Sequence, residues 1–205
     1  MSEIRDLILP FLDPQAHERV RTYFSGPRLY SGGRFELLGG GGDRPEIANT
    51  FTAEDIVAVS LLSVNIPGNA ALAILEEHAE ELNEHLSHLP VGVDLWAAPR
   101  QVVKPGSHAD QLWQLLVEIS DIGWVTAGKL MARKRPRLIP LYDRVVKSAI
   151  NVEDWWLSLH DALQDESLRD RLEEIRSQAG LGDEISLLRV LDVAIWMTGG
   201  DPAAA

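Results

Sequence analysis

Apolar side chains recur at helical spacing along most of this chain. Ile4, Leu7, Ile8 and Phe11 lie at i, i+3, i+4 and i+7, which predicts a first helix. The same kind of spacing predicts helices over residues 15–24, 72–89, 112–119, 124–131, 156–163, 168–175 and 185–197. There is no alternation of strand and helix patterns and no internal repeat. The predicted fold class is therefore all-α.

Another helix is predicted to begin at Thr52. Thr52 and Asp55, three residues apart, form a capping-box pair, in which each side chain binds the backbone N–H of the other residue. The segment 56–66 that follows is apolar on nearly every side. We therefore expect this helix to be central and buried, like the last helix at 185–197.

The helical pattern stops between residues 25 and 49, where glycine and other turn residues accumulate. Residues 34–38 are predicted to form a short strand that pairs with 28–30 across a turn at 31–33. The Gly39–Gly42 run lacks a following Gly-Lys-Ser/Thr, so a flexible turn is favoured over a phosphate-binding loop. The segment is predicted to be a small Gly-rich hairpin insertion.

Composition limits the class of protein. The chain has 205 residues, of which 45% are hydrophobic and 24% charged, as in soluble globular proteins. No apolar run approaches the roughly 20 residues that cross a bilayer, and the first residues lack the basic region of a signal peptide. The absence of cysteine excludes disulfides and Cys-ligated metals. We expect a cytoplasmic monomer that does not bind membranes.

The charge is distributed unevenly. The net charge is −12, which disfavours nucleic-acid binding on average. Residues 128–147, however, contain seven basic residues and one acid, Asp143, so this stretch is at +6 and the rest of the chain is at −18. A solvated helix face is the alternative interpretation of such a run. His78, His85 and His88 lie among glutamates, where solvated histidines are favoured over metal ligands, so no metal site is predicted.

Residues 118–150 combine these basic side chains with a helical hairpin. The pattern predicts a helix, a turn that pivots on Gly123, and a second helix that starts near Trp124. The free backbone N–H groups at the start of the second helix can bind an anion. Lys129, Lys134 and Arg135 would extend such a site along one DNA backbone phosphate. An ordinary αα-hairpin without a ligand is the alternative.

The stretch resembles the helix-hairpin-helix of the base-excision DNA glycosylase superfamily, in its endonuclease III and adenine glycosylase branches. The matching positions are Gly123, Thr126-Ala127-Gly128, Pro140 and Asp143. The resemblance covers about 30 residues closely, and it extends more weakly over residues 55–150 through Leu61-Leu62-Ser63 and Asn65. One departure is Asp121, which stands where the superfamily has its first turn glycine.

The resemblance implies a two-lobe fold and a set of roles. One lobe would be residues 15–137 and the other residues 1–14 with 138–205. Asp143 would be the catalytic carboxylate, and Gly123, Thr126, Lys129, Lys134 and Arg135 would bind double-stranded DNA. Asn65 would fill the gap left by an extruded base. Val125 stands where lyase-type members have a Schiff-base lysine, so the implied activity is hydrolysis, which uses no cofactor.

Four aromatic residues are candidates for stacking on an extruded base. They are Tyr142, Trp124, Tyr30 and Phe35. Aromatic residues in an all-α protein are more often part of the core, and the sequence does not separate the two roles.

The function predicted from these observations is that of a monofunctional DNA glycosylase acting on a damaged or modified base. A stand-alone protein of this kind is also similar to the glycosylases that some bacteria use against phages with hypermodified cytosine. Two alternatives stay open. One is a DNA-binding or regulatory hairpin protein without catalysis, and the other is an acidic protein-interaction factor, which the −18 outside the basic stretch would suit.

Overall fold

A computed structural model of the chain describes residues 3–25 and 30–199, and these residues contain helices, turns and loops but no strand. The all-α prediction is confirmed for this part of the chain. Two compact units are present, one formed by Arg34–Ile139 and one formed by the two chain ends, Met1–Gly33 with Pro140–Ala205. Among the described residues, no helix is both long and apolar enough to cross a membrane.

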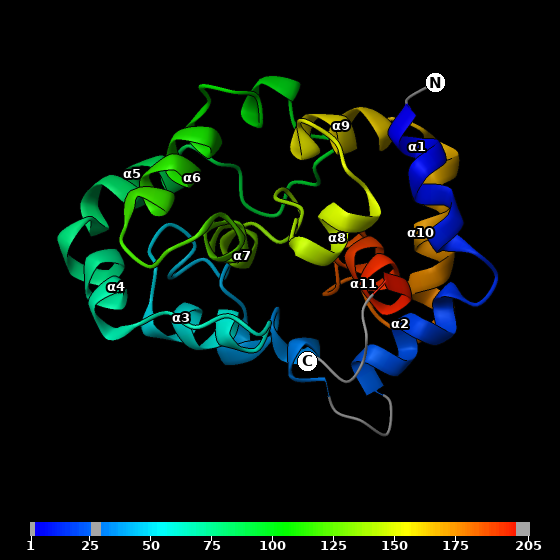
Figure 1. Cartoon of the computed structure of the whole chain (residues 1–205), viewed down its shortest axis with the longest axis horizontal. Coiled ribbons are helices and arrows are strands. Elements are labelled where there is room, and N and C mark those ends of the chain that lie inside the picture. The colour runs from blue at the N-terminus through cyan, green and yellow to red at the C-terminus, as the bar shows by residue number, and fades with distance from the viewer. Residues whose placement is uncertain (1–2, 26–29, 200–205) are drawn as a thin grey trace. The chain divides into compact units, whose positions relative to one another are not determined.

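The unit Arg34–Ile139 is built around α7 (Figure 1). Its elements are η3 (Leu38–Gly40), α3 (Ala53–Ser60), α4 (Gly68–Leu72), the π-helical turn η4 (Ala73–Glu77), α5 (Ala79–Ser87), η5 (Arg100–Val102), α6 (His108–Glu118) and α7 (Trp124–Lys134). Helix α7 packs against α3 and α6, and α5 packs against α6. The side chains of Ala127 and Leu130 on α7 and of Leu112 and Leu116 on α6 are fully buried, which makes α7 the core helix of this unit.

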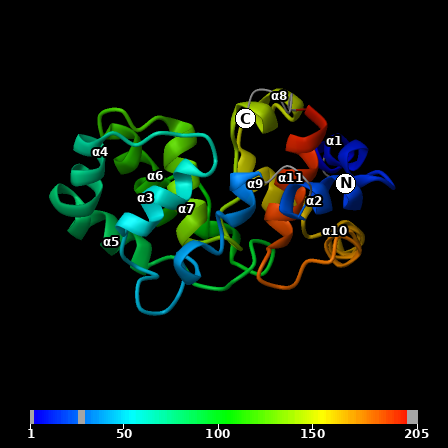
Figure 2. The ribbon, with the colours of Figure 1, turned by 90° about the horizontal axis from the view of Figure 1, so that it is seen from below.

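The unit formed by the chain ends is built around α11, which Figure 2 shows beside α2 and α10. Its elements are α1 (Glu3–Ile8), η1 (Leu9–Leu12), α2 (Ala16–Ser25), α8 (Arg144–Ala149), α9 (Trp155–Ala162), α10 (Glu166–Gln178) and α11 (Leu187–Gly199), while η2 (Ser31–Arg34) reaches the sequence boundary of the two units. Val190, Val193 and Ala194 of α11 are fully buried. The apolar pattern of the last helix therefore predicted its central position correctly.

Helix α3 begins as predicted and ends earlier. The side-chain oxygen Oδ2 of Asp55 accepts the backbone N–H of Thr52 at 2.9 Å, which confirms the capping box. The helix stops at Ser60, however, and Ser63 adopts the left-handed conformation with φ 59° that ends such segments. Val57 is 53% exposed, so the prediction of a wholly buried helix over 56–66 is wrong.

The predicted helix at 72–89 is interrupted. The π-helical turn η4 ends at Glu77, the next residue His78 has a φ of −109°, and α5 starts at Ala79. The apolar spacing continues across this break, since Leu82 and Leu86 are fully buried. The pattern therefore predicted the buried face but not the irregular turn.

The predicted strand at 34–38 is wrong. Residues 31–34 form the 3-10 turn η2 and residues 35–37 a further turn, so the Gly-rich segment is no hairpin. Of its predicted partner 28–30, residues 28 and 29 lie outside the described residues. The short apolar run does not become a strand because Phe35, which is 1% exposed, packs as a single core side chain in a turn.

The division into units differs from the predicted boundary at residues 14 and 15. Helix α2 packs against α10 and α11, so residues 16–25 belong with the chain ends and not with the hairpin. The unit that contains the hairpin begins at Arg34 and ends at Ile139. The buried residues Ala16 and Val20 of α2 explain this, because they need the apolar faces of the C-terminal helices as partners.

Candidate functional site

The turn between α6 and α7 contains a non-glycine residue with positive φ. Asp121 adopts the left-handed conformation with φ 67°. This is the position where the superfamily has its first turn glycine, and glycine is the residue that adopts this conformation most easily. Asp is one of the few other residues that tolerate it, because its short side chain bonds locally.

Gly123 is the N-cap residue of α7, and neither its backbone conformation nor its described neighbours require a glycine there. Its φ and ψ of −82° and 168° suit any residue, and a Cβ atom at this position would meet no atom of the described residues within 4 Å. The residue is exposed. No capping side chain occupies the first N–H groups of α7, so they can bind an anion from outside the chain.

Two other predicted DNA contacts on α7 have buried side chains. The side chain of Thr126 is buried in the first turn of α7, so only its backbone N–H would be available to the predicted phosphate. Lys129 is also buried, and its Nζ donates a hydrogen bond of 2.7 Å to the carbonyl oxygen of Leu62. The prediction that the Lys129 ammonium binds a phosphate is therefore wrong.

The next basic residues of α7 form a buried ionic cluster with Asp55. Arg133 Nε lies 3.1 Å from Asp55 Oδ1, and Lys134 Nζ lies 2.9 Å from Asp55 Oδ2. All three side chains are 0% exposed. Burial lowers the pKa of Lys134, and Asp55 opposes this shift. Lys134 cannot reach DNA from this position, so its prediction as a phosphate contact is wrong.

Arg135 is the third predicted phosphate contact, and it is 1% exposed. Its guanidinium donates to the carbonyl oxygens of Leu86, Leu89 and Ala48 and to the side-chain oxygen of Asn49. Burial lowers the pKa of Arg135 to about 10, so the side chain stays charged at neutral pH. This cation holds the end of α5 against the 48–49 turn and does not face solvent.

The Gly-rich segment covers Arg133. Two of its guanidinium nitrogens donate to the carbonyl oxygens of Phe35, Glu36 and Leu38 at 2.5 to 2.6 Å. A Cβ atom on Gly42 would lie 2.4 Å from the carbonyl oxygen of Arg133, so glycine is required there for close packing. The glycine run is therefore held by specific contacts and is neither a flexible turn nor a phosphate loop.

Asn65 is exposed in the loop after α3, as a wedge residue would be. In the part of the chain that the structure describes, its side chain makes no hydrogen bond, which disfavours the alternative of a hydrogen-bonded helix end. The Lys129–Leu62 bond fixes the start of this loop to the second helix of the hairpin. One unit therefore holds both Gly123 and Asn65.

Asp143 belongs to the other unit and is the N-cap of α8. Its Oδ1 accepts the backbone N–H groups of Val145 at 2.9 Å and Val146 at 3.0 Å. The carboxylate is half-buried, and the capping bonds use only one of its oxygens. Asp154 and Asp165 cap α9 and α10 in a similar way, so capping alone does not distinguish Asp143 from them.

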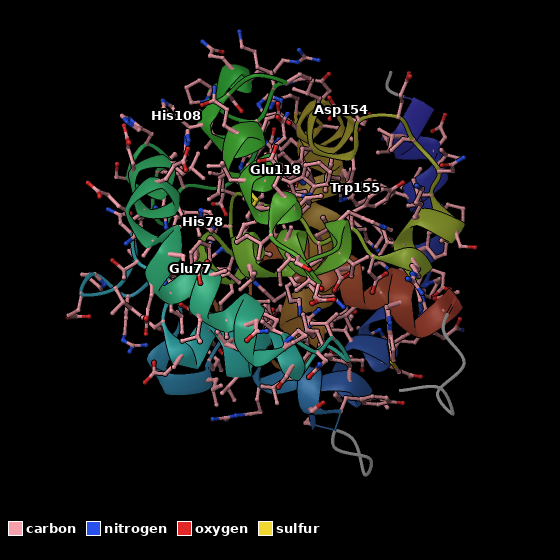
Figure 3. The ribbon with its side chains drawn as sticks, turned by 60° about the vertical axis from the view of Figure 1, so that its left-hand side comes forward. Glu77, His78, His108, Glu118, Asp154 and Trp155 are labelled. Carbon is pink, nitrogen blue, oxygen red and sulfur yellow. The ribbon has the colours of Figure 1, made fainter. Side chains whose placement is uncertain are left out.

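The aromatic candidates lie in different surroundings. The ring of Tyr142 stacks on Trp155 at 5.1 Å, and Trp155, labelled in Figure 3, donates from Nε1 to the carbonyl oxygen of Leu141. Tyr30 stacks on Tyr23 at 5.2 Å. Phe35 is a core residue, so the prediction of Phe35 as a base-stacking residue is wrong. Trp124, the first residue of α7, is half-buried beside Gly123.

Two features of the site had no usable signal in the sequence. Asp55 was identified as a capping residue, but its ionic partners lie 78 and 79 positions away. His108 meets His85, and no spacing rule links residues 23 positions apart on two helices. Among the described residues, no group of three or more His, Asp or Glu side chains is placed to hold a metal ion.

Comparison with protein families places the chain in one of them. A family model described as a family of unknown function, DUF6308, matches residues 16–199. The chain belongs to the DUF6308 family. No curated protein and no solved structure matches this DUF6308 chain. Its function must therefore be argued from its own residues.

Proposed function

We propose that this DUF6308 protein is a monofunctional DNA glycosylase of the helix-hairpin-helix type. The observation that supports it most strongly is Gly123, an exposed glycine at a helix N-terminus that neither φ nor packing requires. A glycine without an internal reason suits a place where the backbone must approach a ligand closely. At the N-terminus of a helix that ligand is an anion, and in this hairpin it would be a DNA phosphate.

Binding to DNA would depend more on the backbone N–H groups at the start of α7 than on charged side chains. Arg133, Lys134 and Arg135 point into the protein, so the surface is more acidic than the sequence average suggests. Arg144 and Lys147 remain exposed on α8. We therefore expect weak non-specific binding and a shallow dependence on salt, because few phosphates are neutralised. Such a protein would select its substrate DNA by which base it can extrude, and not by the strength of its binding to the DNA backbone.

Asn65 would act on the stack of bases. An enzyme that reaches a base inside a duplex extrudes it at a cost of a few kcal/mol. The exposed Asn65 side chain would occupy the space that the extruded base leaves. The bond from Lys129 to Leu62 would hold the loop that contains Asn65 in a fixed position on the hairpin. Hairpin and wedge belong to the same unit, so one body would hold the phosphate and the opened stack.

Asp143 would supply the charge for base release. As the N-glycosidic bond breaks, positive charge develops on the sugar, and a fixed carboxylate stabilises it. The capping bonds of Oδ1 fix the carboxylate and leave Oδ2 to face the sugar or the attacking water. Val125 cannot form a Schiff base, so the products would be a free base and an intact abasic strand. A modified cytosine of phage DNA is the proposed substrate.

Gly123→Asp tests the proposed phosphate site because it should change DNA affinity and protein stability in opposite directions. A carboxylate at the N-cap would bond the first N–H groups of α7 and stabilise the helix, by a few tenths of a kcal/mol as a cap and by about 0.3–1 kcal/mol through the helix dipole. The same carboxylate would fill the phosphate site. We expect a higher melting temperature together with at least about tenfold weaker binding of duplex DNA. Gln101→Glu, exposed on η5 of the same unit, adds the same charge away from the turn and should change neither quantity.

Unchanged DNA affinity in Gly123→Asp would contradict the proposed phosphate site. A parent protein that binds no DNA at 50 mM salt would instead favour the acidic protein-interaction factor.

A hairpin protein without catalysis is the second candidate. It is favoured by the observation that Asp143 caps α8 as Asp154 and Asp165 cap their helices. This candidate predicts DNA binding that depends on Gly123 but no abasic sites in any substrate. An assay for strand cleavage at abasic sites, with duplexes that contain modified cytosines, distinguishes the two candidates.

A further inference from the structure

Three histidines meet where the end of α5 approaches the start of α6, two helices that pack together in one unit. His85 Nδ1 lies 3.0 Å from His108 Nδ1. The ring of His88 stacks on the ring of His108 with centroids 3.9 Å apart and planes at 14°. We call His85, His88 and His108 the histidine cluster. The proposed glycosylase reaction does not use it.

The contact between His85 and His108 fixes the protonation of the pair. A hydrogen bond between two Nδ1 atoms needs one N–H donor and one lone pair, so at least one of the two rings must be neutral. If both rings bind a proton, two N–H groups face each other and the bond is lost. The stacked ring of His88 adds a third charge at van der Waals distance.

The surroundings favour the neutral form of His108. His108 is the first residue of α6, after the N-cap Ser107, where the helix dipole opposes a positive charge. Asp110 in the same turn is bonded to the N–H of Gly106 and to Gln114. Glu84 favours the charged form of His108, but its effect on the pKa is outweighed. Burial and the two neighbouring histidines lower the pKa of His108.

Other charged groups on the neighbouring elements are bound to different partners or lie at the opposite end of α5, so they do not stabilise a protonated His108. Arg135 binds the carbonyl oxygens of Leu86, in the last turn of α5, and of Leu89, just after this helix, so its guanidinium is already engaged. On α7, Lys129 is bonded to Leu62, and Arg133 and Lys134 to Asp55. Glu76, Glu77 and His78 belong to η4 and the turn after it, at the opposite end of α5. His78 and His108, labelled in Figure 3, are the N-cap residue of α5 and the first residue of α6.

We propose that the histidine cluster is a proton-sensitive contact that holds the end of α5 to the start of α6 at neutral pH and releases it in mildly acidic solution, when both rings of the His85–His108 pair bind a proton. A histidine whose pKa is lower in the folded state stabilises the fold above the unfolded pKa of 6.5. That stability is lost as the pH falls through the folded pKa. The contact would make this unit open locally in mildly acidic surroundings while the rest of its core stays closed.

Hydrogen exchange of the full chain tests the proposal. The backbone N–H groups of Leu89 and Gln111 report on the two turns, because they bond to Leu86 and Ser107. Relative to intrinsic rates, we expect protection in residues 85–89 and 108–112 to fall at least about threefold more between pH 7.5 and 5.5 than protection in α3, because each unit of pKa depression is a tenfold change in equilibrium. Equal changes in the three segments would contradict the proposal.

Two variants and a titration complete the test. His108→Gln removes the group that charges at the helix N-terminus, and it should abolish the extra pH dependence. His78→Gln, an exposed histidine of the same unit, should leave it as in the parent. The pKa of the His108 imidazole, followed by NMR in the parent protein, should lie below the ordinary histidine value of 6.5. If the pKa of His108 lies at or above 6.5, or if His108→Gln keeps the full pH dependence, the proposal is overturned.

Discussion

Lys129 Nζ donates a 2.7 Å hydrogen bond to the carbonyl oxygen of Leu62, and this bond joins the second helix of the hairpin to the loop that contains Asn65. A basic residue that was expected on the DNA surface is thus a structural link within one unit. The link explains how a wedge on an exposed loop can keep a fixed place relative to Gly123.

Lys129→Met tests this link. Methionine retains the length of the side chain but leaves the carbonyl oxygen of Leu62 without its ammonium partner, so we expect a loss of about 1–2 kcal/mol in the free energy of unfolding. Base release from duplex DNA should fall because the Asn65 loop loses its anchor. The slope of log affinity against log salt should stay unchanged. A slope lowered by about one unit would instead identify Lys129 as a phosphate contact.

Asp55→Asn tests the buried ionic cluster. The change leaves the guanidinium of Arg133 and the ammonium of Lys134 buried without a counter-charge, so we expect a loss of about 3–5 kcal/mol in the free energy of unfolding. Glu54→Gln on the same helix removes the ion pair between Glu54 and Arg44. Because the Glu54 side chain is 48% exposed, this change should lower the free energy of unfolding by less than about 1 kcal/mol. Urea denaturation measures both. Equal losses would show that Asp55 is not the counter-charge of this cluster.

Asn65→Ala tests the wedge. Because the Asn65 side chain is exposed, its loss should change the free energy of unfolding by less than about 0.5 kcal/mol. Base release should fall mainly on duplex DNA, where a stack must be opened, and much less on a single strand. Rates measured on the two forms of one modified oligonucleotide give the answer. An equal fall on both forms would exclude the wedge role.

Asp121→Gly tests the hairpin turn. Glycine adopts the left-handed conformation of this position without strain, so we expect a gain of about 0.5–1 kcal/mol in stability. The change also removes a carboxylate next to the turn that would hold a phosphate. Affinity for duplex DNA at low salt should rise several-fold, as fluorescence anisotropy would show. Unchanged or weaker binding of duplex DNA would show that this turn does not contact a DNA phosphate.

Local rules of the sequence predicted much of the fold. Apolar spacing gave the helices, and the Thr52–Asp55 pair gave the start of α3, because both depend on residues a few positions apart. Helix ends were less predictable. The left-handed Ser63 stops α3 inside a run that is apolar enough to continue as a helix.

The basic stretch shows why the site was harder to predict than the helices. A run of Lys and Arg has the same pattern whether it faces DNA or the interior. The side chains of Arg133 and Lys134 turn inward because Asp55 and the carbonyl groups of the Gly-rich segment satisfy them, and those partners are distant in sequence. The glycine run was correspondingly misjudged, since its role is to cover Arg133.

Release of a base by the parent protein and by Asp143→Asn tests the central claim most directly. Asparagine caps a helix nearly as well as aspartate but has no charge to stabilise the developing cation. The measurement is the single-turnover rate of abasic-site formation in duplexes with modified cytosines, with melting temperature and DNA affinity as controls. The account predicts release by the parent and a rate at least about a hundredfold lower in Asp143→Asn, with folding and DNA binding retained. Release at the parent rate by Asp143→Asn, or no release from any modified duplex by the parent, would contradict it.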